Sequence, residues 1–334
     1  MVNQIGDRSY FKGRKAFVTG GAGFVGANLT KALVESGSDV IVLERDRNMP
    51  NTLDVFGLRD KVTVVNGSVD DLHLMERVMN EYEPDDVHHL AAQALVSPAN
   101  RSPLSTFEAN IRGTYILLEA CRRAVSVPAV IVASSDKAYG SHETLPYEED
   151  LPLNGTFPYD VSKSCADLLA RSYARTYQMR VCVTRSANIY GPGDMNLSRI
   201  VPGTIVSVLK NERPIIRSDG TPLREFIHVD DVVDGYLTLS RNIDEVGGEV
   251  FNFGSDAPVQ IRELVDHIIR ESGKDGEIEP DVLLSTKIER EIDAQYLSGA
   301  KIAQRLCWKP AIGLKEGIAK TIGWYRDNLN VLST

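Results

Sequence analysis

The sequence is poor in cysteine and contains no long apolar run. Its four cysteines, Cys121, Cys165, Cys182 and Cys307, are widely separated and lack the spacing of metal ligands. We expect reduced thiols, no metal site and a cytoplasmic protein. No stretch approaches the roughly 18 apolar residues of a membrane span, and the N-terminal residues lack an apolar signal core. The sequence therefore predicts neither a membrane span nor export.

Positive charge is also in short supply. The 334 residues include 37 lysines and arginines against 46 aspartates and glutamates, which gives a formal net charge of -9. Such a field repels nucleic acids and anionic membranes, so we expect neither as a partner. A phosphate-bearing ligand must instead be held by local backbone dipoles and a few arginines.

Short apolar runs alternate with helical patterns through the first half of the chain. Buried strands separated by helices form parallel sheets through right-handed crossovers, so we predict a doubly wound α/β sheet of the Rossmann type. The expected strands are 15–20, 40–44, 61–67, 86–92, 129–134 and 180–186. One expected helix follows the first strand and ends near residue 36. The others cover 69–81, 104–124 and 159–178.

The pattern is less regular after residue 187. Glycine and proline mark loops at 191–194, 211–214 and 218–222. A strand and a helix are expected within 225–240, a strand at 251–255 and a helix near 261–272. We predict a sheet domain of residues 12–187 with a returning segment at about 225–255. Residues 188–224 and 256–330 would form a smaller, irregular α/β substrate lobe over the carboxyl edge of the sheet.

A glycine-rich turn, VTGGAGFVG, follows the first expected strand. Gly20 permits the tight turn, Gly23 lets a pyrophosphate approach the backbone, and Gly26 lets helix and strand pack closely. The phosphates would then meet the free N–H groups at the helix N-terminus. Because strand, turn, helix and second strand occur in this order, we predict that the sheet domain binds a dinucleotide.

The end of the second expected strand indicates which dinucleotide. Glu44 lies where an acid hydrogen-bonds the adenosine ribose of NAD and would repel a 2′-phosphate. Arg45 and Arg47 follow and could accommodate that phosphate, so NADP is the less favoured alternative. The run ERDR could also be a solvated group of charges at a strand end.

Tyr159 and Lys163 lie four residues apart, on one face of an expected helix. A tyrosine with an ordinary pKa near 10 is a poor base, and the lysine charge is expected to stabilise its phenolate. Tyr159 could then take a proton from an alcohol while hydride leaves the same carbon. The alternative is an exposed helix start with a solvated lysine.

Ser135, Asp136 and Lys137 occur together in the stretch SSDKAYG. Oxidation of an alcohol needs no further acid or base, so Asp136 and Lys137 indicate an added proton transfer. An aspartate beside a lysine should prefer the ion pair, which suits neither role, whereas burial favours the neutral forms. The two residues could also be an ion pair without a catalytic function.

Seven motifs together resemble the extended short-chain dehydrogenase/reductase superfamily, in its branch of NAD-dependent nucleotide-sugar epimerases and dehydratases. They are TGGAGFVG, HLAAQALV, NIRGT, SSDKAYG, PYDVSK, RSANIYGPGD and REFIHVDD, and the resemblance runs from about residue 15 to 326. It implies an NAD-dependent enzyme that removes hydride from a sugar and usually returns it. The Asp136–Lys137 pair and AAQALV look most like the CDP-glucose 4,6-dehydratases.

This resemblance implies a lyase that acts on CDP-glucose or a related nucleotide-linked hexose. Ser135 and Tyr159 would hold and deprotonate the hydroxyl on carbon 4 while hydride leaves that carbon. Asp136 is the expected acid and Lys137 the expected base for loss of water across carbons 5 and 6, before hydride returns to carbon 6. The alternatives are a 4-epimerase, a UDP-glucuronate decarboxylase and, from another class, a non-catalytic NAD-binding regulator.

Further residues are expected to bind the two ligands. Arginine offers a planar fork to a sugar diphosphate. The substrate candidates are Gln93, Asn188, Arg199, Arg217, Arg224 and Arg290, of which the resemblance favours Asn188 and Arg224. The cofactor candidates, besides Tyr159 and Lys163, are Gly20, Gly23, Phe24, Val25, Glu44, Arg45, Ser68, Val69, Leu90, Ala91, Ala92, Gln93 and Asn110.

The expected helices at 104–124 and 159–178 carry apolar residues on more than one face. Full burial within one chain or a partner subunit would explain this pattern. The resemblance implies a four-helix bundle to which each subunit contributes two such helices. We therefore predict a homodimer.

Overall fold

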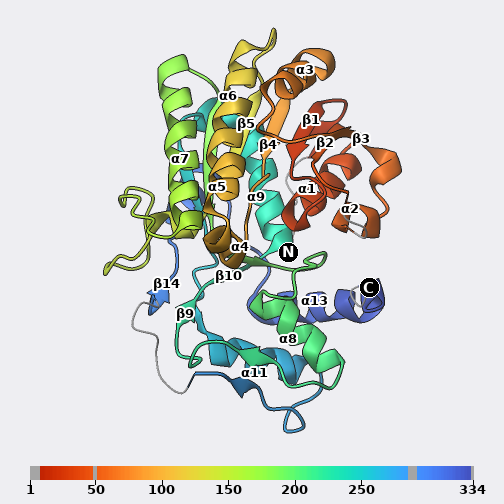
Figure 1. Ribbon diagram of the computed structural model, residues 1–334, viewed down its shortest axis with the longest axis vertical. Coiled ribbons are helices and arrows are strands. Elements are labelled where there is room, and N and C mark those ends of the chain that lie inside the picture. Colours follow the sequence, from red (N-terminus) through yellow and green to blue (C-terminus); the bar gives the residue numbers. More distant parts are fainter. Residues whose placement is uncertain (1–7, 48–50, 285–291, 332–334) are drawn as a thin grey trace.

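The computed structural model describes residues 8–47, 51–284 and 292–331. A sheet flanked by helices lies above a smaller lobe, and α8, α11 and α13 belong to that lobe (Figure 1). The first residues of α8 line a cavity together with residues that follow the sheet strands, so the lobe faces the carboxyl edge of the sheet, as predicted.

Seven parallel strands form the sheet, in the order β11-β6-β5-β4-β1-β2-β3. They are β1 Lys15–Thr19, β2 Asp39–Glu44, β3 Thr63–Asn66, β4 Asp86–His89, β5 Ala129–Ala133, β6 Val181–Ser186 and β11 Val250–Phe253. The central strands are buried almost throughout, as expected when helices cover both faces. The predicted doubly wound Rossmann fold is confirmed, and the chain returns to the sheet at β11.

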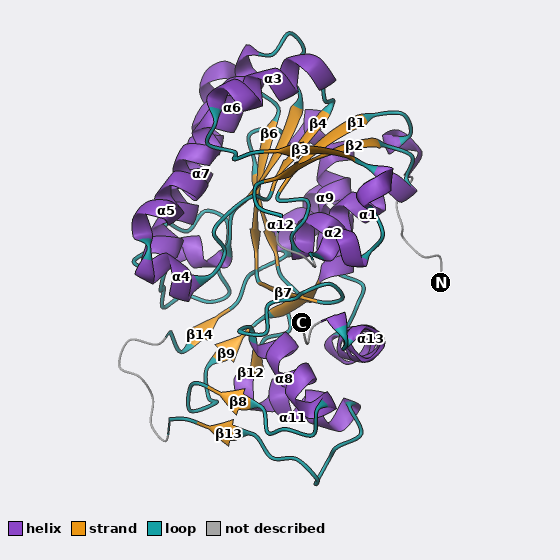
Figure 2. Cartoon of the chain, turned by 45° about the vertical axis from the view of Figure 1, so that its right-hand side comes forward, coloured by secondary structure: helices purple, strands orange, loops and turns teal. Residues whose placement is uncertain are grey.

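Helices cover both faces of the sheet (Figure 2). One face carries α3 Leu72–Tyr82, α6 Gly113–Arg123 and α7 Pro158–Tyr177, and the other carries α1 Phe24–Glu35, α9 Val229–Arg241 and α12 Ala300–Leu306. Neighbouring residues of β1 point into different cores: Phe17 packs with Met79 and Leu117, whereas Val18 packs with Leu33 and Val232. This alternation of side chains across the strand gives the sheet two separate hydrophobic cores.

The long helix predicted over 104–124 is present, but it contains a π-helical turn that the sequence does not predict. α4 Val96–Arg101 and α5 Pro103–Phe107 precede a π-helical turn, Glu108–Arg112, which leads into α6. Within this turn the Asn110 amide bonds both the N–H and the C=O of Gln93, at 2.7 and 3.2 Å, and donates to the Ser162 hydroxyl at 2.8 Å. These buried bonds stabilise the irregular turn, and apolar spacing alone does not reveal them.

The lobe contains more regular structure than the sequence predicts. Its helices are α8 Ile200–Leu209, α11 Ile261–Glu271 and α13 Leu314–Asn328, of which only α11 was expected. Its strands, also unexpected except near β10, are β7 Asn188–Tyr190, β8 Ile215–Ile216, β9 Leu223–Arg224, β10 Phe226–His228, β12 Val259–Gln260, β13 Asp281–Val282 and β14 Ala294–Gln295. Two short helices, α2 Thr52–Val55 and α10 Ile243–Val246, lie in the sheet domain. A strand of two residues is too short to show an alternation of apolar and polar side chains in the sequence. The boundaries between the two domains stay a prediction.

A buried carboxylate joins the lobe to the end of the sheet. Glu225, between β9 and β10, is only 1% exposed. It accepts hydrogen bonds from the N–H groups of Ser255 and Asp256 after β11, both at 2.7 Å, and of Leu297 after β14 at 3.0 Å. Burial raises the pKa of Glu225 to about 7, although these three donors lower it.

The loop 191–194 makes a second connection between the two parts. The Asn28 amide of α1 donates to the Pro192 carbonyl at 2.9 Å, and the Thr52 hydroxyl of α2 donates to the Gly193 carbonyl at 2.8 Å. The Tyr325 hydroxyl of α13 donates to the Asp194 carbonyl. One short loop therefore holds two helices of the sheet domain and one of the lobe.

Among the helices of the described residues, none combines the length and the apolar character needed to cross a bilayer. All four cysteines are free thiols, and Cys121 and Cys182 are buried. Burial raises the pKa of the Cys121 thiol to about 12, so this thiol is chemically inert at neutral pH.

The buried His88 predicts acid sensitivity of the fold. Its ring is 0% exposed on β4, neither nitrogen has a hydrogen-bond partner among the described residues, and burial lowers its pKa from 6.5 to about 4. The folded state resists protonation, so stability is present above pH 6.5 and is lost as pH falls towards 4, by about 3 kcal/mol. We expect His88→Leu to remove that part of the loss, measured by urea unfolding at several pH values. The same substitution at exposed His73 is the matched control, and an unchanged pH dependence in His88→Leu would contradict the argument.

Candidate active site

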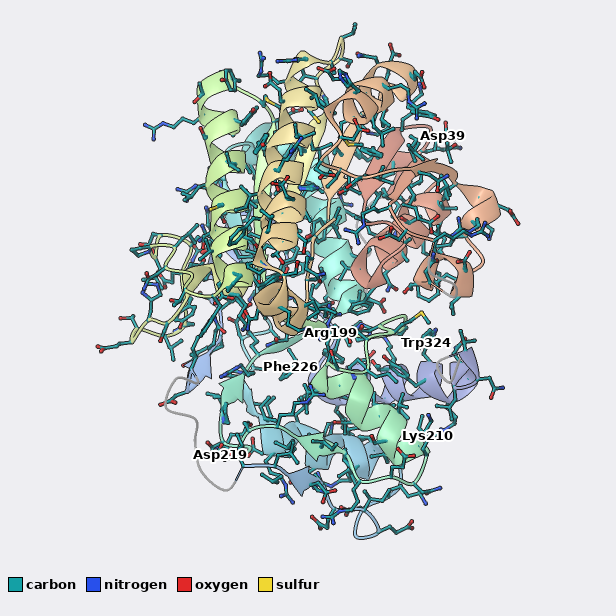
Figure 3. The ribbon with its side chains drawn as sticks, in the orientation of Figure 1. Asp39, Arg199, Lys210, Asp219, Phe226 and Trp324 are labelled. Carbon is teal, nitrogen blue, oxygen red and sulfur yellow. The ribbon has the colours of Figure 1, made fainter. Side chains whose placement is uncertain are left out.

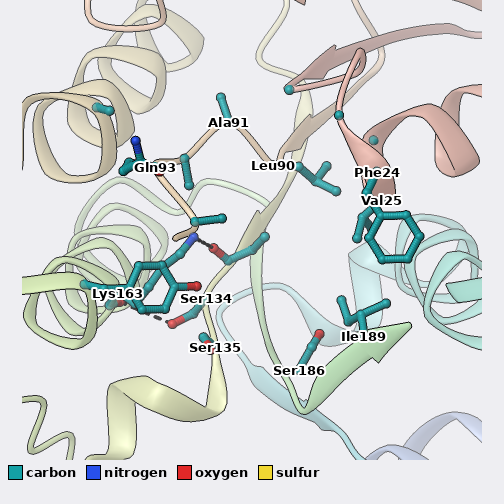
Figure 4. Close-up of a pocket in the computed structure, with 18 of the residues that line it drawn as sticks. Phe24, Val25, Leu90, Ala91, Gln93, Ser134, Ser135, Lys163, Ser186 and Ile189 are labelled. Carbon is teal, nitrogen blue, oxygen red and sulfur yellow. Dashed lines mark hydrogen bonds between the residues drawn. The ribbon is translucent and has the colours of Figure 1, made fainter. Parts of the chain in front are cut away.

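A cavity of about 720 Å³ opens where the carboxyl ends of the sheet strands face the lobe. It is lined by residues that follow β1, β2, β3, β4, β5 and β6, and by the start of α8. Figure 4 labels some of these residues, among them Phe24, Leu90 and Ser135. Arg199 and Phe226, two of the residues labelled in Figure 3, lie where the sheet domain meets the lobe. Ligands of doubly wound sheets bind at this edge, and the volume suits a cofactor or substrate.

The glycine turn leaves no room for side chains. Gly20 adopts a φ of +72°, which favours glycine, and a Cβ there would lie 2.8 Å from the Ala91 nitrogen. A Cβ on Gly26 would lie 2.1 Å from the Gly20 carbonyl oxygen. Gly23 is the N-cap of α1 and brings no side chain over the first N–H groups of that helix. The turn therefore presents bare backbone to the cavity, as its sequence predicts.

Glu44 lines the cavity at the end of β2, but it is not a free carboxylate. Arg59 donates to both of its oxygens, at 2.9 and 3.0 Å, and the Asn51 amide donates at 2.8 Å. These bonds raise the pKa of Arg59 and fix the orientation of the acid. Arg45 is exposed and bonds Asp46 at 2.6 Å instead.

A buried polar network supports the loop after β4. The Thr114 hydroxyl donates to the Asn110 carbonyl at 2.6 Å, so it must accept from His89 Nε2, 3.0 Å away. His89 Nδ1 then accepts from the Thr19 hydroxyl at 2.8 Å, and that oxygen accepts the N–H of Ala91 at 3.1 Å. Burial and nearby Lys163 lower the pKa of His89 to about 3, so the ring is neutral. Asn110 itself does not line the cavity but holds the loop that does.

Tyr159 and Lys163 both line the cavity. Lys163 is buried and donates to the Ala133 carbonyl at 2.8 Å (Figure 4). Burial lowers the pKa of Lys163 to about 8 and raises the pKa of Tyr159 to about 12, although a hydrogen bond with Ser135 lowers the latter. Burial is the largest cause of both shifts, and the expected stabilisation of the phenolate by Lys163 stays a prediction.

Asp136 and Lys137 form an ion pair at the edge of the same cavity. Lys137 Nζ lies 3.0 Å from Asp136 Oδ2, and the Ser135 hydroxyl donates to Asp136 Oδ1 at 2.9 Å. Because Ser135 also bonds Tyr159, four polar groups stand in a row: phenol, hydroxyl, carboxylate and amine. The ion pair expected from the sequence is present.

The predicted substrate residues divide between two cavities. Asn188 and Gln93 line the larger one, whereas Arg217 and Arg224 line a neighbouring cavity of about 370 Å³. Arg199 lines both, and its guanidinium bonds the buried Asp194 at 3.0 Å. Arg290 lies outside the described residues. The larger cavity is also lined by Phe24, Val25, Ser68, Val69, Leu90, Ala91 and Ala92, and their part in cofactor binding stays a prediction.

Two supporting groups escape sequence reasoning. Arg59 and Asn51 hold Glu44, yet neither belongs to a recognisable sequence motif. Gln295 bonds Lys137 from the short strand β14, 158 residues away in the chain. No local pattern could have identified either contact, because both arise from the tertiary fold.

The sequence pattern of the NAD dependent epimerase/dehydratase family matches residues 16–254. The chain belongs to this family. The dTDP-glucose 4,6-dehydratase of Streptomyces antibioticus is 35% identical over 93% of this chain and 92% of its own length. The CDP-glucose 4,6-dehydratase of Salmonella typhimurium is 28% identical over 96% and 92%. The structure of Thermotoga maritima UDP-glucose 4-epimerase with UDP-glucose has a TM-score of 0.85 and 29% identity, covering 94% of this chain and 99% of that one.

NAD is the cofactor of this epimerase/dehydratase family member, and the residues of the cavity fit it. The bare backbone at Gly20 and Gly23 and the N-terminus of α1 suit a pyrophosphate. The buried carboxylate of Glu44 suits a ribose with free hydroxyls and disfavours a 2′-phosphate. The expected preference for NAD is confirmed.

The close contact at Gly26 predicts a loss of cofactor binding on substitution. In Gly26→Ala the added methyl would meet the Gly20 carbonyl, so the turn must move. We expect NAD affinity to fall more than tenfold, measured by calorimetry without substrate. Gly323→Ala on α13 is the matched control, since nothing lies within 4 Å of its Cβ position and alanine favours a helix. Unchanged NAD affinity in Gly26→Ala would contradict this account of the turn.

Proposed function

We propose that the chain is an NAD-dependent nucleotide-sugar 4,6-dehydratase. The observation that carries the proposal is the Asp136–Lys137 ion pair, which stands beside Ser135 and Tyr159 on one cavity. Oxidation at carbon 4 requires only Tyr159, supported by Ser135 and Lys163. Loss of water from carbons 5 and 6 also requires one acid and one base, and this pair supplies both.

The ion pair can become an acid and a base by moving one proton. Transfer from Lys137 Nζ to Asp136 Oδ2, along a 3.0 Å hydrogen bond, gives a neutral amine and a carboxylic acid. The amine then takes the proton from carbon 5, and Asp136 protonates the hydroxyl that leaves carbon 6 as water. NAD, when bound, would accept hydride from carbon 4 and supply it again to carbon 6.

The proton balance gives Ser135 a role beyond holding the substrate. Lys137 exchanges its N–H protons with solvent and returns one proton to carbon 5, but the proton that Asp136 gives to water must be replaced. Tyr159 begins the proposed cycle as a phenolate and takes one proton from the hydroxyl on carbon 4. Ser135 is hydrogen-bonded to both Tyr159 and Asp136, so it can relay that proton and restore the pair. The net reaction releases one water and forms a 4-keto-6-deoxy sugar.

The substrate we propose is a hexose linked to a nucleoside diphosphate. Arg199, Arg217 and Arg224 stand at the smaller cavity, next to the catalytic one, and would bind the diphosphate. Relatives that act on dTDP-glucose, CDP-glucose and UDP-glucose support this class of substrate. Among them, the lysine at 137 favours CDP-glucose.

A 4-epimerase is the second candidate, because the overall fold closely matches a UDP-glucose 4-epimerase. In that reaction hydride returns to carbon 4, no bond to carbon 5 breaks, and Asp136 and Lys137 would only shape the cavity. The decarboxylase and the non-catalytic regulator have less support, because neither needs both a phenol relay and this ion pair.

We also propose a homodimer that forms through helices 104–124 and 159–178. α5, α6 and α7 carry the exposed side chains of Leu104, Tyr115 and Leu168, which are 70%, 38% and 54% exposed. Large apolar side chains on neighbouring helices are typical of a protein–protein contact. The cytoplasmic location stays a prediction.

Turnover in heavy water tests the proposed reaction. With CDP-glucose, dTDP-glucose or UDP-glucose, we expect a 4-keto-6-deoxy product that carries solvent deuterium on carbon 5, observed by NMR. Lys137→Ala should lose deuterium incorporation while reduction of NAD at 340 nm persists. Lys210→Ala, at an exposed position on the lobe, controls for loss of a lysine. A 4-epimer without deuterium, or full incorporation in Lys137→Ala, would count against the proposal.

Solution mass tests the dimer. We expect scattering to give twice the 36.8 kDa chain mass, and Leu168→Glu to give a single chain, because a buried unpaired charge opposes association. Leu283→Glu is the control, since Leu283 is 62% exposed on the lobe. A monomeric mass for the unsubstituted protein would sink the dimer.

A further inference from the structure

Gln295 lies on β14, in the lobe, yet its side chain reaches the active site. It is only 1% exposed. Its Nε2 donates to the backbone carbonyl of Asp136 at 3.1 Å, and its Oε1 accepts a hydrogen bond from Lys137 Nζ. The carbonyl can only accept and the amine must donate, so these two contacts fix which end of the amide faces which partner.

From this geometry we infer that Gln295 is a positioning residue for Lys137. This inference rests on the proposed dehydratase reaction, in which Lys137 is the base. An amine on a flexible four-carbon side chain can rotate freely unless its N–H groups are held. Asp136 and Gln295 each hold one N–H of Lys137, from two different parts of the fold.

The two fixed N–H groups determine the direction of the remaining position on nitrogen. A neutral amine has two N–H groups and one lone pair. Once its proton has moved to Asp136, the lone pair of Lys137 first faces Asp136. Rotation about the Cε–Nζ bond turns one N–H back towards Asp136 and leaves the other on Gln295, so that the lone pair occupies the third site while the Asp136 proton turns to the hydroxyl on carbon 6. Lys137 lines the cavity, so this site is the one available to a proton on the bound sugar. Gln295 thus orients the base without touching the substrate.

The strand that carries Gln295 is itself held firmly. β14 pairs with β9, and Gln295 lies opposite Arg224 in that ladder. Two residues further on, the Leu297 N–H donates to buried Glu225 at 3.0 Å. The candidate diphosphate residue Arg224 and the residue that orients Lys137 therefore sit on adjacent strands, so both ends of the sugar nucleotide depend on one small sheet.

The decisive experiment is a double-mutant cycle on Gln295 and Lys137. Gln295→Met keeps the length of the side chain and removes both hydrogen bonds. We expect deuterium exchange at carbon 5 to fall at least tenfold, with NAD reduction and KM for the sugar nucleotide changed less than twofold. In the Lys137→Ala background the same substitution should have no further effect on exchange, because Gln295 acts through Lys137. Gln304→Met, on the exposed face of α12, is the matched control.

The outcomes separate this inference from the reaction it rests on. If the unsubstituted protein forms a 4-epimer without deuterium, the dehydratase proposal fails and the role of Gln295 fails with it. If the unsubstituted protein is a dehydratase but Gln295→Met exchanges at the normal rate, only the role of Gln295 is overturned. Equal losses of NAD reduction and exchange would show a structural role and would also overturn it.

A measurement without substrate keeps the inference testable if turnover is low. Trace acetylation with acetic anhydride, read by mass spectrometry, reports the freedom of each amine. We expect Lys137 to react at least threefold faster in Gln295→Met, with Lys210 as the internal reference. Gln295→Asn, which keeps the amide but shortens its reach, should give the same increase. Unchanged labelling of Lys137 in both folded variants would overturn the inference.

Discussion

Glu225 is the buried carboxylate on which the junction between sheet and lobe depends. Its side chain collects N–H groups from the segment after β11 and from the segment after β14, which are otherwise separate in the chain. A buried acid with this many donors is stable only while all of them stay in place. The position of β14, and with it Gln295, follows from this arrangement. So does the ladder between β14 and β9, which carries Arg224.

In the candidate active site, burial and hydrogen bonding have opposite effects on the pKa of Tyr159. Burial raises the pKa of Tyr159 and lowers the pKa of Lys163, which favours the neutral form of both side chains. Ser135 opposes this for Tyr159 and also bonds Asp136, which is held by Lys137. In the reaction that we propose, this row of groups would pass protons between Tyr159 and Asp136. The glycine turn needs no such balance, because there the backbone itself makes the contacts.

Much of the fold and the cavity could be predicted from the sequence, for a physical reason. Several sheet strands are buried apolar runs, and Gly20, Tyr159 and Lys163 belong to short motifs with fixed local spacing. The π-helical turn at 108–112 could not be predicted, since it depends on Gln93 and Ser162 from other segments. The partners of Glu44 and Lys137 were missed for the same reason: two-residue strands and loops gain their structure only from tertiary contacts.

Arg199 has a consequence for the order in which ligands could leave. It lines both cavities, and its guanidinium lies 5.9 Å from the ring centre of Phe24, beside the glycine turn. A diphosphate held by Arg199 would therefore stand across the mouth of the dinucleotide compartment. The bound nucleotide sugar would then block the exit of the cofactor during a catalytic cycle. A reaction that returns its hydride regenerates the oxidised cofactor, so the same dinucleotide would serve the next sugar without leaving.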